Sequence, residues 1–592
     1  MERTVQTANI RGQVSRSDGM KVFTGTGMSA GLALAPAFIL EKPALPVDTA
    51  PGIPAAETER LKEAVRMAEE QLQAVLRQAR ERFARRDAAV FEAQLLMLHD
   101  QLFAEEIAAR IAEGMNAAAA VQKAGYALAE RFFAMDNDYF REWAEDVLDV
   151  AYRLCCCLTG TEMTEPEQPD GPAVIIARQL APSDIAMLDP AGINGIITEA
   201  DNHAGHSAVL IRALGIPAVG GVKGIVKTAV NGEAVLVDGN AGTVILNPDE
   251  TARLRWQSAM EDRQRVREEL AGLKHLPAVT LDGKQVDTAA NLSSLQELSA
   301  AAESGADGIG LFRTEFLGLD SSGFPDEEEQ FEAYCRILKA MAGRRTVIRT
   351  MDAGADKPLP GMASAAEANP ALGLRGLRFS LQEEELFRTQ LRALLRASVY
   401  GQLAVMFPMV TTVGEFRRAK QILLEEKEKL QKAGIPVSET VETGLMIEVP
   451  AAAVMADVLA AEADFFSIGT NDLIQYTLAS DRLNTRVAGL YGALEPAVLR
   501  LIRMTVEAAH AKGCRCAVCG EMAADAEGMM LLVGLGADEL SVSPHDLLRI
   551  RKQVRSISAA EMQKLAEQAC RAGSSEEVHE LLSGYRDNSC II

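Results

Sequence analysis

The spacing of apolar residues changes several times along the chain. Residues 21–41 alternate apolar and small residues, which predicts one or two strands with turns. Between about residue 57 and residue 160, apolar residues recur at helical spacing with charges between them, which predicts four helices, over 57–86, 88–112, 117–134 and 138–159. Short strand and helix patterns alternate again over 171–247. Because strand patterns flank the helices on both sides, we expect a small α/β domain with an inserted helical bundle.

A longer and more regular alternation begins after residue 275. Eight apolar segments of strand length are separated mostly by helical patterns, which predicts a (β/α)₈ barrel. A doubly wound open sheet is the alternative. The strand candidates lie near 286–290, 308–312, 346–349, 403–407, 444–448, 464–468, 514–519 and 539–542, and the clearest helical patterns cover 326–342, 383–398, 414–432, 450–462 and 496–512.

The changes of pattern divide the chain into six parts and predict a multidomain α/β protein. We expect an N-terminal extension over 1–19, an α/β domain over 20–45 and 165–248, a helical domain over 46–164, a linker helix over 249–273, a barrel over 274–557 and a C-terminal tail over 558–592.

Polar or reactive side chains follow several of the predicted barrel strands. Such residues belong to one face if the strands form a barrel, because all strands then end at the same rim. Any one of them alone would be read as a solvated charge, but five strand ends together indicate a site. They are Arg313, Arg349, Glu448, the pair Asn471 and Asp472, and Cys519, with Arg482 ten residues beyond Asp472.

Composition and charge narrow the possible functions. A net charge of -23 argues against a nucleic-acid-binding surface, which needs a basic face. The longest apolar runs are too short to cross a bilayer, and residues 1–21 lack the apolar core of a secretory signal. The nine cysteines are best read as reduced thiols of a cytoplasmic protein. A zinc site at Cys514, Cys516 and Cys519 is the less favoured alternative, because no second cysteine or histidine pair follows at a suitable spacing.

The residues at the strand ends favour a phosphorylated and carboxylated small molecule. Three arginines can bind oxyanions with many hydrogen bonds, and carboxylates such as Glu448 and Asp472 are the oxygen ligands that Mg²⁺ prefers. Cys519 is a candidate proton donor, although a small buried strand residue is an equally good reading of it.

A phosphoryl acceptor is expected in the α/β domain. Residues 198–212 predict a strand end, a loop and a helix that begins near His206. An imidazole at a helix N-terminus suits a phosphoryl group, because the helix end favours negative charge. His203 is the rival position, and an ordinary loop histidine is the alternative reading of either residue.

Five stretches together carry a resemblance to a known family. They are Phe466 to Arg482, Gly310 to Phe316, Arg349-Thr-Met-Asp352, Asn369-Pro370 through Arg375, and Cys519-Gly-Glu521. From about residue 22 to about residue 557, the chain resembles Enzyme I of the bacterial phosphoenolpyruvate-dependent sugar phosphotransferase system, a phosphoenolpyruvate-protein phosphotransferase.

The resemblance implies a complete reaction. Phosphoenolpyruvate would bind in the barrel with Mg²⁺ on Glu448 and Asp472, and its phosphoryl group would pass to His206 of a swivelling α/β domain. The α/β domain would then swing to the helical domain and deliver the phosphoryl group to the small histidine-carrying protein HPr. Cys519 would protonate the enolpyruvate to give pyruvate. The barrel would form a homodimer. The residues implied to hold the phosphate and carboxylate are Arg313, Arg349, Arg482 and Asn471, with Lys357 and Arg375 as helpers.

The sequence departs from the family pattern mainly around the histidine. Ile185 stands where many members carry a threonine that supports the imidazole, and isoleucine cannot hydrogen-bond. Asp201, Asn202 and Gly205 also differ, as do Ala355 and Leu483 near the barrel site. These differences predict slower phosphorylation of His206 or a specialised partner. The alternative function is a diverged regulatory paralogue or a phosphoenolpyruvate-sensing adaptor with weak phosphotransfer.

Overall fold

The computed structural model describes residues 19–589 except 42–44, 49, 84, 134–137, 162–168, 170, 202–204, 320–323, 355–366, 368, 483 and 485. The chain divides into two compact units, one ending at Gln264 and the other beginning at Arg265. The boundary falls inside α9 (Glu250–Gly272), the helix predicted over 249–273. No helix in the described part of the chain is long and apolar enough to span a bilayer.

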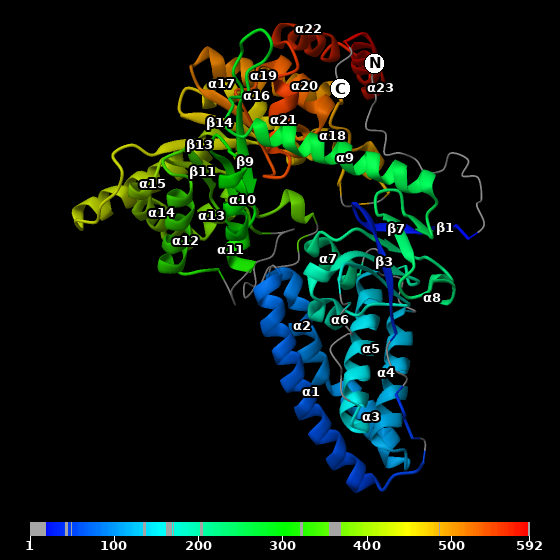
Figure 1. Ribbon diagram of the computed structural model, residues 1–592. Helices are drawn as coiled ribbons and strands as arrows, with labels where there is room; N and C mark the ends of the chain where they lie inside the picture. The colour runs from blue at the N-terminus through cyan, green and yellow to red at the C-terminus, as the bar shows by residue number, and fades with distance from the viewer. Residues whose placement is uncertain are drawn as a thin grey trace. The chain divides into compact units, whose positions relative to one another are not determined.

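The first unit contains an eight-stranded sheet that is built from both sides of the helical insert, as the pattern predicted (Figure 1). The strand order is β1-β8-β7-β3-β4-β5-β6-β2, and β3 to β6 run parallel. Before the insert come β1 (Lys21–Thr24), β2 (Thr26–Ser29) and β3 (Leu32–Leu40). After it come β4 (Ala173–Ala177), α6 (Pro182–Met187), β5 (Ile193–Thr198), α7 (His206–Leu214), β6 (Ala218–Gly220), α8 (Ile225–Thr228), β7 (Ala234–Asp238) and β8 (Thr243–Leu246).

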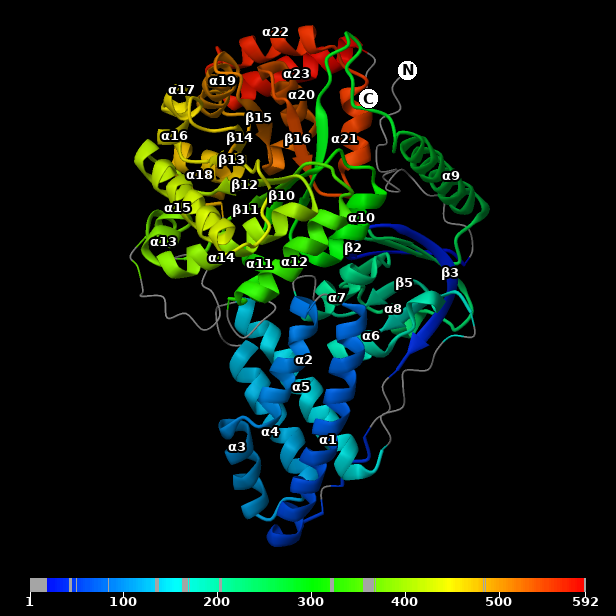
Figure 2. The same ribbon diagram turned by 90° about the vertical axis from the view of Figure 1, so that its left-hand side faces the viewer.

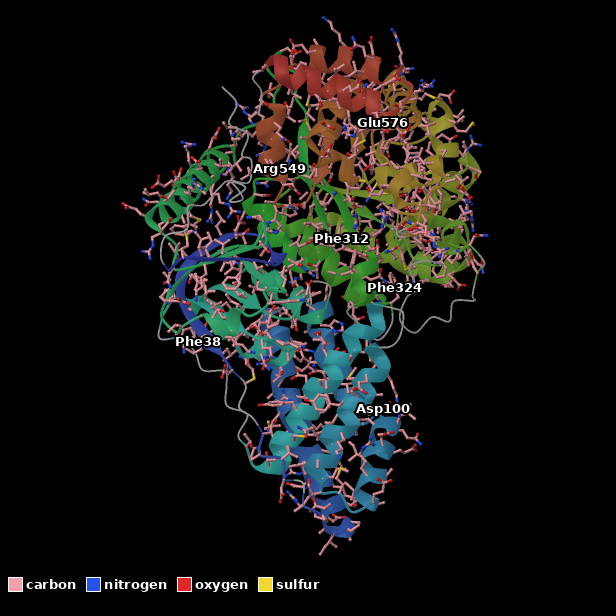
Figure 3. The ribbon with its side chains drawn as sticks, turned by 90° about the vertical axis from the view of Figure 1, so that its right-hand side faces the viewer. Phe38, Asp100, Phe312, Phe324, Arg549 and Glu576 are labelled. Atoms are coloured by element: carbon pink, nitrogen blue, oxygen red, sulfur yellow. The ribbon has the colours of Figure 1, made fainter. Side chains whose placement is uncertain are left out.

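The described residues of the insert form five helices where the periodicity predicted four. The segment expected as one helix over 88–112 is broken between Leu98 and Gln101, because the Asp100 side chain accepts a hydrogen bond from the Phe103 backbone N–H at 2.9 Å and begins a new helix (Figure 3). The apolar spacing continues across the break, so periodicity alone concealed it. The helices are α1 (Pro54–Arg82), α2 (Arg85–Leu98), α3 (Gln101–Ala112), α4 (Ala117–Phe133) and α5 (Asp138–Thr159).

The insert and the α/β domain share a hydrophobic core. Phe83 and Phe91 from the insert are buried in the same cluster as Ile185 on α6 and Ile211 on α7. The Arg82 guanidinium donates to the backbone oxygen of Leu188 at 2.8 Å, which ties α1 to the end of α6. The two predicted domains are therefore parts of one compact unit.

The second unit is a closed barrel of eight parallel strands, as predicted, so the open-sheet alternative is wrong (Figure 2). Each predicted strand segment overlaps an observed strand, whereas the helix expected over 450–462 is two short helices. The strands are β9 (Asp287–Leu292), β10 (Ile309–Arg313), β11 (Thr346–Arg349), β12 (Leu403–Phe407), β13 (Glu442–Ile447), β14 (Phe465–Ile468), β15 (Arg515–Val518) and β16 (Glu539–Val542). The helices between them are α10 (Leu298–Glu303), α11 (Glu315–Leu319), α12 (Glu327–Ala340), α13 (Leu377–Gln382), α14 (Glu384–Ala397), α15 (Val413–Lys432), α16 (Pro450–Val454), α17 (Ala456–Leu459), α18 (Thr470–Leu478), α19 (Pro496–Ala511) and α20 (Ala526–Leu535).

The segment expected as a C-terminal tail belongs to the barrel unit. After α21 (Leu547–Val554), it forms α22 (Ala559–Ala569) and α23 (Ser575–Ser589), whose Met562 and Leu582 are fully buried in the barrel's outer core. Helix α22 approaches α20 closely because Gly534 has no side chain: a Cβ there would lie 2.2 Å from the backbone oxygen of Met562. The segment after residue 557 therefore packs on the barrel, because its apolar residues complete the core.

Candidate functional site

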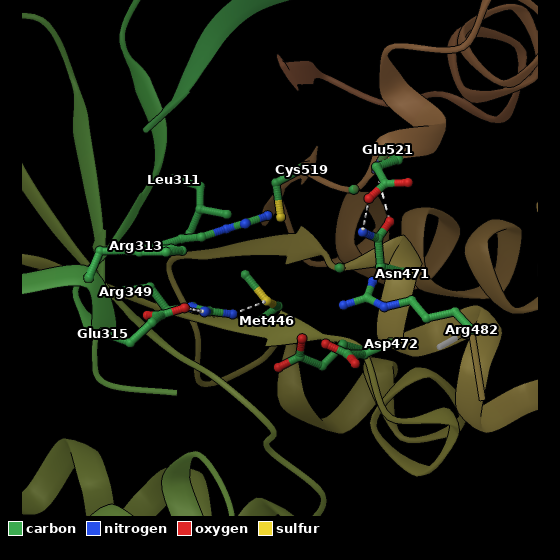
Figure 4. A pocket seen from close by; sticks show the side chains of 14 residues that line it. Leu311, Arg313, Glu315, Arg349, Met446, Asn471, Asp472, Arg482, Cys519 and Glu521 are labelled. Atoms are coloured by element: carbon green, nitrogen blue, oxygen red, sulfur yellow. Dashed lines mark hydrogen bonds and ion pairs between the residues drawn. The ribbon is translucent and has the colours of Figure 1, made fainter. Parts of the chain in front are cut away.

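A cavity of about 410 Å³ opens at the carboxyl ends of the barrel strands (Figure 4). The barrel fold places it there, since parallel strands end at one rim and their following loops meet above it. Arg313 and Arg482 extend into it from opposite sides in Figure 4. The cavity is lined by Leu311, Arg313, Glu315, Phe316, Arg349, Met446, Glu448, Gly469, Asn471, Asp472, Arg482, Cys519, Gly520 and Glu521.

Most of the residues predicted from the strand ends lie together in this cavity. Arg313 and Arg349 are the last residues of β10 and β11, and Glu448 and Cys519 directly follow β13 and β15. Asn471 and Asp472 occupy the first turn of α18, where the helix dipole favours a carboxylate or a bound anion. Lys357, Ala355 and Leu483 lie outside the described residues.

Arg349 is held in place by two carboxylates. Its guanidinium lies 2.5 Å from a carboxylate oxygen of Glu315 and 3.3 Å from one of Asp352. Burial opposes its charge, but Glu315 and Asp352 outweigh burial and raise the pKa of Arg349. Sequence reasoning missed Glu315, although it stands in the quoted segment Gly310 to Phe316. The missed signal was a carboxylate two residues after a strand-end arginine.

Arg375 lies behind the cavity wall, since it is not among the lining residues. It is 1% exposed, and its guanidinium binds both oxygens of Asp352 at 3.1 Å and those of Asp472 at 3.0 and 3.4 Å. Burial again opposes the charge, and Asp352 and Asp472 raise the pKa of Arg375. The Arg375 guanidinium therefore holds the Asp472 carboxylate in place.

Glu448 is a buried carboxyl group whose charge is only partly compensated. Its Oε1 accepts a hydrogen bond from the Met409 backbone N–H at 2.6 Å. Burial, together with Asp472 and Asp352, raises the pKa of Glu448 to about 8. Gly469 allows this arrangement, because a Cβ there would lie 3.0 Å from Glu448 Oε2. A cation beside Glu448 and Asp472 would balance this excess of negative charge.

Asn471 and Cys519 are brought together by a close approach of two loops. Asn471 donates to Glu521 Oε1 at 2.9 Å and accepts from the Glu521 backbone N–H at 3.0 Å. The loops can meet because residue 520 is glycine: a Cβ on Gly520 would lie 1.8 Å from Thr470 Oγ1. Burial raises the pKa of the Cys519 thiol to about 11, so the thiol carries its proton at neutral pH.

The three neighbouring cysteines do not share a site. Cys514 and Cys516 pack in the outer core of the barrel, whereas Cys519 belongs to the cluster inside the barrel. In the described ranges, no group of three or more histidine, cysteine or acidic residues is arranged to hold a metal ion. Glu448 and Asp472 supply two carboxylates, which suits Mg²⁺ because that ion usually takes its other ligands from substrate and water.

His206 is the first residue of α7, as predicted, and its imidazole meets a residue that sequence reasoning missed. His206 Nδ1 lies 3.0 Å from Oδ2 of Asp146, which α5 of the helical insert contributes. Burial raises the pKa of Asp146, while His206 and Gln94 act in the opposite direction. Because Asp146 stands 60 residues before His206 on an amphipathic helix, no local pattern marked it.

The atypical positions around the histidine are placed as follows. Ile185 is fully buried in the core shared with the insert. Asp201 is exposed and accepts a hydrogen bond from Thr26 Oγ1 at 3.3 Å. Gly205 is the N-cap residue of α7 and offers no side-chain cap. The rival His203 and Asn202 lie outside the described residues.

Comparisons with known protein families give matches in both compact units. Three family models match: the N-terminal domain of PEP-utilising enzymes over 24–142, their mobile domain over 169–242 and their PEP-binding domain over 267–559. The last match contains the cavity, and the mobile-domain match contains His206.

Whole-length relatives match almost the entire chain. The phosphoenolpyruvate-protein phosphotransferase of Staphylococcus carnosus is 42% identical over 571 residues, which cover 96% of this chain and all of that protein. The protein of the same name from Geobacillus stearothermophilus is 44% identical over 561 residues, covering 94% of this chain and 97% of that protein. With this identity over nearly its full length, the chain belongs to the phosphoenolpyruvate-protein phosphotransferase family.

Proposed function

We propose that the protein transfers the phosphoryl group of phosphoenolpyruvate to His206 and then to a histidine of an HPr-like phosphocarrier protein, releasing pyruvate. The reaction would be the first step of phosphotransfer in sugar uptake, in the cytoplasm. The observation that carries the proposal is the cavity itself. Three arginines, four carboxylates (the candidate metal ligands Glu448 and Asp472 among them) and a protonated thiol line one cavity at the carboxyl end of the barrel.

The cavity suits the two charged ends of phosphoenolpyruvate. Arg313, Arg349 and Arg482 can bind phosphate and carboxylate oxygens, and the start of α18 adds backbone N–H groups. Mg²⁺ held by Glu448 and Asp472 would supply positive charge beside the transferring phosphoryl group. The pKa of Glu448, raised by burial and neighbouring carboxylates, supports a cation there.

The side chains of His206 and Cys519 would supply the nucleophile and the proton that the transfer needs. Nε2 of His206 would attack phosphorus, and the bond from phosphorus to the enol oxygen would break, leaving its electron pair on the enolate of pyruvate. The Cys519 thiol would then give its proton to the methylene carbon, which yields pyruvate and a thiolate that regains a proton from water. Burial, which keeps the thiol protonated, supports this role.

Two exposed apolar surfaces support the proposal that the protein binds a phosphocarrier and forms a homodimer. Leu96 and Leu102, on either side of the break between α2 and α3, are 76% and 69% exposed and offer a surface for the phosphocarrier. On the barrel unit, α16 and α17 pack against α19, and these segments expose several large apolar side chains, which fits a homodimer interface. The exposed side chains are Val454, Met455, Val458 and Met504.

The test uses phosphoenolpyruvate labelled with ³²P on the phosphate, with Mg²⁺ and the full-length chain. We expect acid-labile, alkali-stable label on the wild type, loss of the label in His206→Ala, and transfer of the label to HPr. Label that survives His206→Ala would refute the assignment of the acceptor. Binding of phosphoenolpyruvate without any label would instead support a sensing adaptor. Wild-type-like transfer rates to ordinary HPr would contradict the prediction that the atypical histidine loop slows the reaction.

A further inference from the structure

We propose that Asp146 is the positioning residue of the acceptor histidine, and that it fixes the proton of His206 on Nδ1 so that Nε2 presents the lone pair to phosphorus. The inference rests on the proposed function for its consequence, but its structural part concerns the unphosphorylated protein. It assigns a role in the reaction to the helical insert beyond partner binding, since Asp146 lies on α5.

The contact between Asp146 and His206 joins two segments that differ in exposure. The His206 side chain is 32% exposed, whereas the Asp146 side chain is 1% exposed. Nδ1 and Oδ2 are 3.0 Å apart, which is hydrogen-bonding distance. A buried carboxylate facing a more exposed imidazole can orient the ring while leaving its outer side accessible to a substrate.

A buried polar network holds Asp146 in this orientation. Gln94 Nε2 donates to Asp146 Oδ1 at 3.3 Å and to Asp149 Oδ2 at 3.2 Å. Ser183 Oγ, in the turn that begins α6, lies 2.8 Å from both oxygens of Asp149. Each carboxylate oxygen of Asp146 therefore has its own partner, Gln94 on Oδ1 and His206 on Oδ2, so the carboxylate cannot rotate without losing one of them.

The chemistry of a carboxylate decides the tautomer. An ionised Asp146 can only accept a hydrogen bond, so Nδ1 of His206 must carry the hydrogen and Nε2 the lone pair. When Nε2 bonds to phosphorus, the ring becomes a cation that Asp146 stabilises. When the phosphorus–nitrogen bond breaks in the onward transfer, the ring leaves as neutral imidazole with its Nδ1 hydrogen in place. No proton has to leave or enter the ring in either step.

Ile185 removes one other possible support for the imidazole. Its side chain is fully buried among apolar residues and has no hydrogen-bonding atom, so the turn at 182–185 cannot hold the imidazole through that position. The same turn supports the imidazole indirectly. Ser183 hydrogen-bonds to Asp149, and Gln94 donates to both Asp149 and Asp146.

The network also predicts an unusual order of mutant effects. In Asp146→Asn, Gln94 still has to donate to Asp149, so its Nε2 keeps facing residue 146 as a donor. The asparagine must then present its oxygen to Gln94 and its NH₂ group to His206. That NH₂ group donates to Nδ1 and moves the ring hydrogen to Nε2, which blocks the attacking nitrogen. The isosteric variant is therefore expected to be at least as impaired as Asp146→Ala, because orienting amides that impose the wrong tautomer cost up to about 10⁴-fold in other histidine sites.

The experiment combines kinetics with spectroscopy on full-length protein. Single-turnover phosphorylation by ³²P-labelled phosphoenolpyruvate with Mg²⁺ should be slowed about 10- to 100-fold in Asp146→Ala and at least as much in Asp146→Asn. ¹⁵N NMR of histidine-labelled, unphosphorylated protein should show the His206 ring, identified by its absence from His206→Ala, with hydrogen on Nδ1 in the wild type and on Nε2 in Asp146→Asn. Glu57→Gln is the matched control, a buried carboxylate of the same unit that binds Arg60 and the Ala117 N–H, and should change neither readout.

The outcomes separate the inference from the proposed function. A wild-type ring with hydrogen on Nε2, an unchanged tautomer in Asp146→Asn, or an Asp146→Asn protein faster than Asp146→Ala would overturn the inference. The NMR readout requires no phosphotransfer, so it stands even if the wild type accepts no label. If Asp146→Ala fails to fold, the wild-type tautomer and the isosteric variant still decide the matter.

Discussion

Replacing Arg375 by methionine tests how strongly the buried Asp352 and the cavity-lining Asp472 depend on one buried cation. Arg375 makes four contacts of 3.0–3.4 Å with Asp352 and Asp472, and Asp352 is fully buried. Methionine fills much of the space but leaves both carboxylates without this partner. Removing one member of a buried ion pair typically costs about 3–5 kcal/mol, because the remaining charge stays desolvated. We expect a loss of that size in the free energy of unfolding of the barrel unit.

Hydrogen exchange followed by mass spectrometry measures this loss unit by unit. Peptides from β11 and β14 should exchange about 10²- to 10⁴-fold faster in Arg375→Met, since about 1.36 kcal/mol corresponds to a factor of ten. Peptides from β4 and β5, in the other unit, serve as the internal reference. Arg417→Ala is the control: it removes an ion pair with Glu462 in which Arg417 is 64% exposed, and should cost less than about 1 kcal/mol.

A second substitution tests the physical cause. Adding Asp352→Asn to Arg375→Met removes one of the two carboxylates that lost Arg375 as a partner. Arg349 then keeps Glu315 but loses Asp352, so only part of the lost stability should return. If Arg375→Met exchanges no faster than Arg417→Ala, the argument from the loss of a buried counter-ion is wrong.

Three further predictions follow from single side chains. Cys519→Ala should still bind phosphoenolpyruvate in calorimetry but form pyruvate about 10²- to 10⁴-fold more slowly; near-normal pyruvate formation would exclude the thiol as proton donor. Because burial raises the pKa of Cys519 from 9.0 to about 11, the folded protein retains this proton longer than the unfolded chain, and stability should fall as pH rises from 9 to 11. This part of the pH dependence should be smaller in Cys519→Ala, and an equal loss in both proteins would contradict the shift. Leu582→Ala should destabilise the barrel unit by about 2–5 kcal/mol in denaturant unfolding, whereas a free tail would show no change.

Patterns of short range determined most of the fold. A period of two marks strands and a period near 3.6 marks helices, and both are properties of neighbouring residues, so the eight barrel strands were placed from sequence. Where the apolar spacing continued across a helix boundary, as at Asp100, periodicity failed. The Asp100 side chain defines that boundary, and the packing of α22 on α20 follows no short-range pattern.

The sequence by itself also determined which polar residues meet in the barrel, because parallel strands bring their carboxyl ends to one rim and thereby gather Arg313, Glu448 and Cys519. Only the tertiary structure decided how those groups are held. Arg375 and Asp472 are 97 positions apart, and Asp146 and His206 are 60 positions apart. Such partners follow no period, since their contact depends on how whole helices and strands pack.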